Sequence, residues 1–363
     1  MKKYKKIKLI LVLNCVFFLL MLQTTAYAQE KVIYLGNTTV KLNNNNFYLL
    51  KIIDERPDKR RIGIVYNEAK EDVYLKLLNG TVKTSNEFLT KFSRKNNASY
   101  PIVLTIKELK IAEKIVNSKI VNGSSEIKVE FSFMRDSTLI ALTPFQTQIT
   151  FTRSFNVTDR YQYLIGRLLD KSLLYFDQWM TVNFDKNPLL IKAVQLNIKP
   201  DYGIEEPVSG DTVFWSNKYK LSWKDFEGRK PLSTQFAAQV FTNFEYNALA
   251  NLKNGVLIID LQLKAYMLKS ASWTSHALSE EHLAHEQLHF DITKVIVERY
   301  KKKASKMLTI DDYDSELQLL FIEMYRELNR LQKEYDAESN HSINFVGQQK
   351  WQSLISDELR VIR

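Results

Sequence analysis

Residues 279–303 read SEEHLAHEQLHFDITKVIVERYKKK, and this stretch decides the fold of the C-terminal half. Ser279 suits the N-cap of a helix, two glutamates follow it in the first turn, and three lysines end the stretch, as the helix dipole favours. Leucine, isoleucine and valine recur along it at helical spacing, so one face can pack on a core. The pattern predicts a rigid helix from about residue 280 to 303.

This helix carries two histidines one turn apart, His285 and His289, with Glu286 between them. At about 100° per residue the two imidazoles differ by about 40° in direction, so both can bind one metal ion. Glu286 can accept a proton from a zinc-bound water without binding the metal itself. All 5 histidines of the chain lie between His276 and His341. The sequence therefore predicts a site for Zn²⁺, with Glu286 as the catalytic base.

A catalytic zinc site usually has three protein ligands, so a third is expected from elsewhere in the chain. Glu298 lies about 180° around the helix from the two histidines and is excluded. Apolar residues at helical spacing between 317 and 335 predict a second helix, antiparallel to the first, followed by a loop over 335–342 that can return to the metal. His341 in this loop is the preferred third ligand, and Asp336 is the runner-up.

Three other side chains near this motif also have expected roles. Tyr335 is a candidate catalytic residue that donates a hydrogen bond to the oxyanion of a tetrahedral intermediate, or else a core residue that ends an apolar stripe. His282 is expected to contact a ligand histidine or the substrate, and as a fourth ligand it would instead indicate a structural zinc site. Asp291 faces another side of the helix, and a structural hydrogen bond is expected for it.

The first 28 residues have the pattern of a cleavable signal peptide. Basic residues lead into an apolar run from Leu9 to Leu22, and Ala26-Tyr27-Ala28 follows. The run is shorter than the roughly 20 residues that a spanning helix needs, and no later segment qualifies. We therefore expect an exported, periplasmic or extracellular protein, with no transmembrane segment in its mature part.

Charge and cysteine content limit the function further. The leader holds 5 of the 51 basic residues, so the remaining 46 exceed the 41 acidic ones by only about 5. Such a surface has no dense basic stripe, and nucleic-acid binding is not expected. The only cysteine, Cys15, lies in the leader, so neither disulfides nor cysteine ligands are expected in the mature chain.

The remaining chain is long enough for two domains, and the predicted fold class is α+β. Residues 29–200 alternate strands with two helices, predicted over 85–92 and 158–179, and residues 201–212 are the predicted linker. The charged segment 54–61 is expected to be a solvated loop; with the strands beside it, it also resembles periplasmic lipoprotein domains of the YajG type. That resemblance implies a docking or adaptor role towards an envelope protein.

Several motifs of the predicted domain 213–363, in order along the chain, resemble the bacterial domain of unknown function 922. They are Leu221-Ser222-Trp223-x-Asp225-Phe226-x-Gly228, Ser272-Trp273, His285-Glu286-Gln287-x-His289-Phe290-Asp291, Tyr335-Asp336-x-Glu338-x-x-His341, and Gln348 or Gln349 followed by Trp351. That family is described as predicted secreted zinc-dependent proteases. The resemblance implies a zincin-like fold with a small antiparallel sheet. This chain departs from the pattern at Leu288, Ser339 and Ser342, where glycine, threonine and glycine are expected.

The sequence thus predicts a secreted zinc-dependent metallohydrolase that cleaves peptide or protein substrates. The strand predicted over 255–268 is either an edge strand that binds an extended peptide or a core strand. A metal-dependent amidase acting on the cell wall could use the same ligands. A different class of function is an envelope binding or assembly protein whose zinc is structural. Substrate profiling and the number of protein ligands distinguish these alternatives.

Overall fold

A computed structural model describes residues 29–35, 40–43, 46–89, 100–157, 160–275 and 279–361. The predicted signal peptide, 1–28, and His276 lie outside these ranges. The fold is α+β, as predicted, and the chain divides between Asn183 and Phe184 into two compact units. In the described part, no helix is both long and apolar enough to cross a bilayer.

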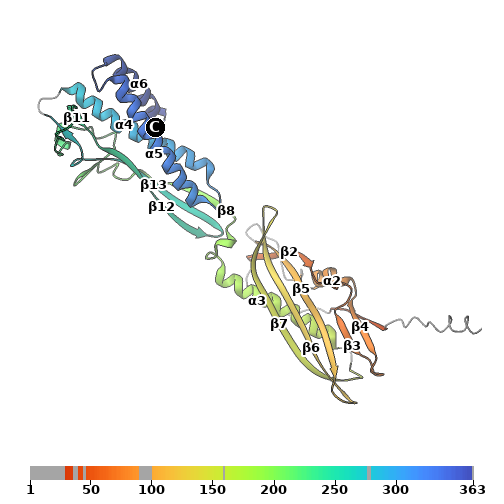
Figure 1. The fold of residues 1–363 in the computed structure, drawn as a ribbon. Coiled ribbons are helices and arrows are strands. Elements are labelled where there is room, and N and C mark those ends of the chain that lie inside the picture. The colour runs from red at the N-terminus through yellow and green to blue at the C-terminus, as the bar shows by residue number, and fades with distance from the viewer. Residues whose placement is uncertain are drawn as a thin grey trace, which may run out of the picture. The chain divides into compact units, whose positions relative to one another are not determined.

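The first unit is a seven-stranded sheet with helices packed on it (Figure 1). Its strands follow the order β1-β4-β3-β5-β6-β7, and β2 also pairs with β5. The helix α3 packs its apolar face on β6 and β7, where Phe176 stacks on Phe131. The strands and helices of this unit are β1 (Gln29–Ile33), β2 (Phe47–Asp54), β3 (Gly63–Tyr66), β4 (Asp72–Leu77), α2 (Gly80–Leu89), β5 (Tyr100–Ile115), β6 (Ile120–Arg135), β7 (Thr138–Ser154) and α3 (Arg160–Asn183).

The charged segment 54–61 is not wholly solvated, which corrects the sequence-based expectation. Arg56 is only 4% exposed and pairs with Asp54, 2.9 Å from Nη2 to Oδ2. It also donates to the carbonyls of Arg61 and Leu109 and to the hydroxyl of Thr81. A buried guanidinium needs such partners, since an unpaired buried charge is costly. This ion pair therefore holds the loop after β2 against β5 and α2.

The second unit packs three helices on a five-stranded sheet. The apolar face of α4 contacts β12 and β13, while α5 and α6 pack on α4 (Figure 1). The elements are β8 (Ala193–Ile198), β9 (Val208–Ser209), β10 (Thr212–Phe214), β11 (Ala238–Gln239), β12 (Thr242–Lys253), β13 (Val256–Leu268), β14 (Trp273–Thr274), α4 (Glu280–Met307), α5 (Tyr313–Ser339) and α6 (Phe345–Val361). Two 3₁₀ turns are present: Pro188–Leu190 precedes β8, and Trp223–Asp225 lies between β10 and β11.

Two predictions about this sheet need correction. The strand β8 precedes the predicted linker 201–212, yet it pairs in parallel with β13, so the second unit begins earlier than predicted and the sheet is mixed rather than antiparallel. The strand β13 is flanked by β12 on one side and by β8 and β10 on the other. It is therefore a core strand without a free edge for a peptide.

Candidate metal centre

His285 and His289 are presented by the first half of α4, and an adjacent face of this helix is anchored in the core. Leu288, Ile292 and Val295 are at most 4% exposed and hold that face against the sheet. Leu288 therefore serves as a core side chain. The helices α4 and α5 run antiparallel, because Tyr300 near the end of α4 donates to the carbonyl of Leu317 near the start of α5.

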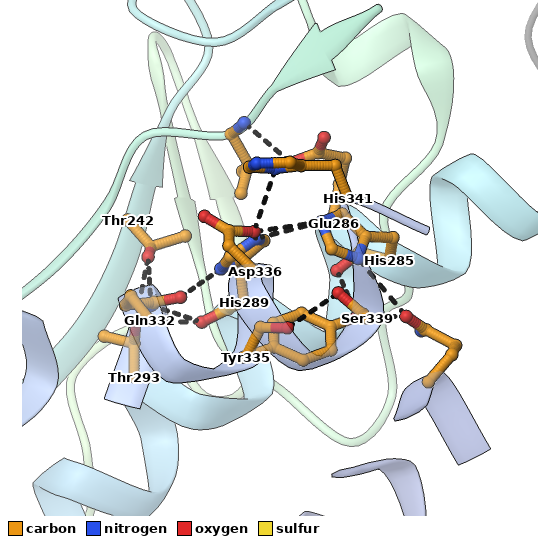
Figure 2. A network of polar contacts seen from close by, with 12 residues as sticks. Thr242, His285, Glu286, His289, Thr293, Gln332, Tyr335, Asp336, Ser339 and His341 are labelled. Carbon is orange, nitrogen blue, oxygen red and sulfur yellow. Dashed lines mark hydrogen bonds and ion pairs between the residues drawn. The ribbon is translucent and has the colours of Figure 1, made fainter. Parts of the chain in front are cut away.

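Three ligand atoms converge between these helices (Figure 2). His285 Nε2 and His289 Nε2 are 3.2 Å apart, and Asp336 Oδ1 lies 3.2 Å from the first and 2.9 Å from the second. Ligand atoms about 2.0 to 2.1 Å from a tetrahedral zinc lie about 3.3 to 3.4 Å from each other. The observed separations are close to these values, so the residues present fit a zinc ion.

The histidines are oriented by two glutamines that sequence reasoning did not assign. Gln332 donates from Nε2 to the carbonyl of His289, 2.9 Å, so its Oε1 faces Nδ1 of the same histidine. Gln348 Oε1 lies 3.2 Å from Nδ1 of His285. Each Nδ1 therefore carries the proton, and each Nε2 turns a lone pair towards Asp336, which is the tautomer that binds a metal.

The polar environment of Asp336 supports this arrangement. In the described part of the chain its Oδ1 is buried and has no hydrogen-bond partner, although Nε2 of His285 and Nε2 of His289 lie within 3.2 Å of it. Burial raises the pKa of Asp336, but His285 and His289 outweigh it and hold that pKa well below its usual range. Burial lowers the pKa of His289, yet Asp336 and Glu286 raise it above the ordinary value. The cluster is therefore an anionic cavity that favours a proton or a metal cation.

Asp336, the runner-up third ligand, belongs to the group of close ligand atoms, whereas His341, the preferred one, does not. The helix α5 continues to Ser339, so residues 336–339, predicted as part of a loop, are helical. His341 Nδ1 lies 3.5 Å from Asp336 Oδ1, the imidazole is 45% exposed, and its ring contacts Phe236 at a tilted angle. In the described part of the chain, the group of close ligand atoms excludes His341. His341 lies beside the cluster, facing the solvent.

The segment that carries His341 has an unusual backbone. Asn340, His341 and Ser342 have φ angles of 48°, 49° and 74°. Three successive left-handed residues other than glycine are rare, because each costs about 1 kcal/mol or more. Asn340 is a favourable C-cap, whereas serine at position 342 is a less favourable residue for a left-handed backbone. This geometry turns the chain sharply after α5 and fixes where His341 lies.

Tyr335 does not face the cleft, so its predicted role as an oxyanion donor is wrong. It is fully buried, its hydroxyl donates to Gln348 Oε1 at 2.6 Å, and its ring stacks on His285 with 4.6 Å between centroids. Burial raises the pKa of this phenol far above its usual range. Tyr335 therefore orients Gln348 and packs against a ligand histidine.

Glu286 lies beside the three ligand atoms and is only 6% exposed. Its Oε2 accepts a hydrogen bond from the backbone N–H of Val240, 2.9 Å. Both residues line a cleft of about 630 Å³ that also contains His285, His289 and Asp336. Glu286 is thus held by one oxygen at the wall of a solvent-accessible cleft, as a general base needs.

The remaining residues considered in the sequence lie outside the group of three ligand atoms. His282 lines the cleft, but its Nδ1 is 3.0 Å from the hydroxyl of Ser279 and it is outside the ligand group. Asp291 accepts hydrogen bonds from Trp215 Nε1 at 2.7 Å and Gln287 Nε2 at 2.9 Å, as expected for a structural residue. Glu298 pairs with lysines of its own helix, away from the centre.

Comparisons with known proteins name no function for this site. No family model matches the chain, and no curated protein matches it. Among solved structures, one match is the crystal structure of protein XCC0632 from Xanthomonas campestris, of family DUF330, with 9% identity, a TM-score of 0.26 and coverage of 42% of this chain and 95% of that one. Another, titled only as an uncharacterized protein, has 10% identity, a TM-score of 0.23 and coverage of 43% and 97%. TM-scores this low assign neither a fold nor a function.

Proposed function

We propose that this chain is a zinc-dependent metallohydrolase, most simply a peptidase, that acts after export. The convergence of His285 Nε2, His289 Nε2 and Asp336 Oδ1 supports the proposal. Three lone-pair atoms at 2.9 to 3.2 Å would repel one another without a proton or a cation between them. When bound there, zinc would supply Lewis acidity that favours the ionisation of water and polarises a carbonyl group.

Glu286 provides the proton transfer in this proposal. Val240 holds one of its oxygens, so the other can accept a proton from water in the cleft and later deliver it to the leaving amine. Gln332, Gln348 and Tyr335 keep the imidazoles in the ligating tautomer. The metal side chains and the base are all fixed by hydrogen bonds or helix packing, so little reorganisation is needed before reaction.

Zinc content and peptide hydrolysis of the purified protein test this function. The wild type is expected to bind one zinc ion and cleave unfolded protein. Glu286→Gln is expected to keep the zinc and lose activity by about 10²-fold or more, as for loss of a general base. Full activity in the metal-loaded Glu286→Gln variant contradicts the mechanism.

Experiments on the same purified protein also test two alternative functions. A structural zinc site predicts that metal removal unfolds the second unit and that the wild type cleaves no peptide. A cell-wall amidase predicts release of peptides from peptidoglycan with no cleavage of protein substrates. Either outcome replaces the peptidase assignment.

A further inference from the structure

The cleft that contains the metal centre is almost free of charge. Among the described residues that line it, none is lysine or arginine, and only Glu286 and Asp336 are acidic. Both carboxylates already have a role: Asp336 contacts the two histidines, and Glu286 accepts from the N–H of Val240 with one oxygen and is the proposed base through the other. Asparagine, glutamine, threonine and apolar side chains make up most of the rest.

These walls lack the groups that recognise a chain terminus. Capture of a free carboxylate calls for a cation such as arginine, and capture of a free ammonium group calls for an available carboxylate. Charged side chains of a substrate would lose hydration in the cleft without gaining a partner. The lining therefore suits the uncharged interior of a peptide chain.

A short strand in the wall offers backbone groups to such a chain. In the pair β11–β14, the carbonyl of Ala237 accepts from Ser275 N at 2.7 Å, and Gln239 pairs with Trp273. Adjacent residues of a strand turn their backbone groups to opposite sides. Ala238 and Val240 thus turn away from β14, and Val240 N–H does reach Glu286. Ala238 lines the cleft and presents its N–H and C=O on the same side.

The cleft extends unequally on the two sides of the centre along α5. Tyr325, also in the lining, precedes Asp336 by 11 residues, which is about 16 Å along the helix, or about five residues of extended peptide. Beyond Asp336, the lining ends at Ile343, just past the left-handed segment. One side of the centre therefore has room for more substrate residues than the other.

We propose, on the basis of the peptidase function above, that the enzyme is an endopeptidase for extended segments of uncharged residues. The substrate pairs with Ala238 through backbone hydrogen bonds. About five residues lie on the Tyr325 side of the cleaved bond and fewer on the Ile343 side.

Matched quenched fluorescent peptides test the proposal on the full-length zinc-loaded protein. One set has both ends blocked by acetyl and amide groups and the other has free ends, with neutral or charged residues at each position. Blocked neutral peptides are expected to be cleaved as fast as free ones, and each charge in the cleft to lower kcat/KM by about 10-fold. N-methylation of the substrate amide opposite Ala238 is expected to lower kcat/KM by a similar factor.

Variants of exposed residues on α5 locate the longer side of the cleft. Tyr325 is 42% exposed and lines the cleft, while Ile322 is 47% exposed on the same helix and does not. Tyr325→Arg is expected to raise kcat/KM about 5-fold for peptides with an acidic residue four or five positions from the cleaved bond, and Ile322→Arg to leave it unchanged.

The outcomes distinguish the endopeptidase inference from the peptidase function on which it rests. Cleavage that requires a free terminus, or an equal response of the two arginine variants, overturns the endopeptidase inference and leaves the peptidase function standing. Absence of cleavage in every peptide, with zinc bound, overturns both.

Discussion

Substitution of Asp336 is expected to lower zinc affinity much more than substitution of His341. Asp336→Ala removes an atom of the three-atom cluster, so zinc affinity is expected to fall by more than the roughly 10- to 100-fold that loss of an outer hydrogen-bond partner costs. His341→Ala is expected to change it by less than about 10-fold, because the imidazole lies outside the cluster. Competition with a chromogenic chelator measures both. Equal losses of zinc affinity in the two variants would indicate that His341 is also a zinc ligand.

The glutamine behind His289 is a second test at the residue scale. Gln332→Leu removes the acceptor of the Nδ1 proton, so zinc affinity is expected to fall about 10- to 100-fold while the fold persists. Gln318→Leu is the matched control, since Gln318 is an exposed residue of the same helix that donates a hydrogen bond to Asp314 one turn away. Chelator competition with circular dichroism on both variants checks the effect. An unchanged affinity in Gln332→Leu contradicts the orienting role.

Residue patterns predicted two histidines as ligands and Glu286 as the base, but the choice of a third ligand depended on where a helix ends. Ala337 and Glu338 extend α5 beyond the apolar stripe, and Asn340 stops it in a left-handed cap. One extra turn keeps Asp336 on the helix, four residues after Gln332 and on the same face. Helix boundaries are the least certain part of a sequence-based prediction, and here they decided between two ligands.

At the scale of elements, one arginine joins the three helices of the second unit. Arg299 on α4 pairs with Glu327 on α5 and Glu358 on α6, and all three are less than one-third exposed. Arg299→Ala is expected to lower the free energy of unfolding by about 1 to 3 kcal/mol, between the values of surface and buried ion pairs. Denaturant unfolding with intrinsic fluorescence measures this change.

Arg330→Ala is the matched control for that prediction. Its partner Glu334 lies one turn away on α5, and the pair is half exposed. The expected change is within about 0.5 kcal/mol, because exposed ion pairs of one helix contribute little. Comparable losses in both variants would show that the arginine on α4 contributes no more than an ordinary surface ion pair.

At the scale of the whole molecule, the boundary between the units is testable by truncation. A fragment of residues 184–363 contains β8 and is expected to fold and bind zinc. A fragment that starts at the predicted linker, residues 201–363, lacks β8 and exposes Leu257, Ile259 and Leu261 of β13, so its melting temperature is expected to be lower by about 5 °C or more. Equal melting temperatures would contradict the assignment of β8 to the second unit.

Sequence patterns predicted the α+β class and most strands of the first unit, but not this boundary. Local alternation and helical spacing are visible within a window of a few residues. The pairing of β8 with β13 joins segments about 60 residues apart, from Ala193 with Val256 to Ile198 with Leu261, and no local signal encodes it. The proline and glycine residues of 199–212 predicted a linker between the units. In the structure they form turns within the second unit.

The strand β7 offers an edge at which two molecules can associate. It is the last strand of its sheet in the described part of the chain, and residues 138–152 contain no charged side chain. Edge strands of this kind can template pairing with another chain, and charges or prolines usually prevent it. Pro144 removes one donor, and the rest of the edge stays available. Aggregation during folding or concentration would therefore begin at β7, far in sequence from the candidate metal centre.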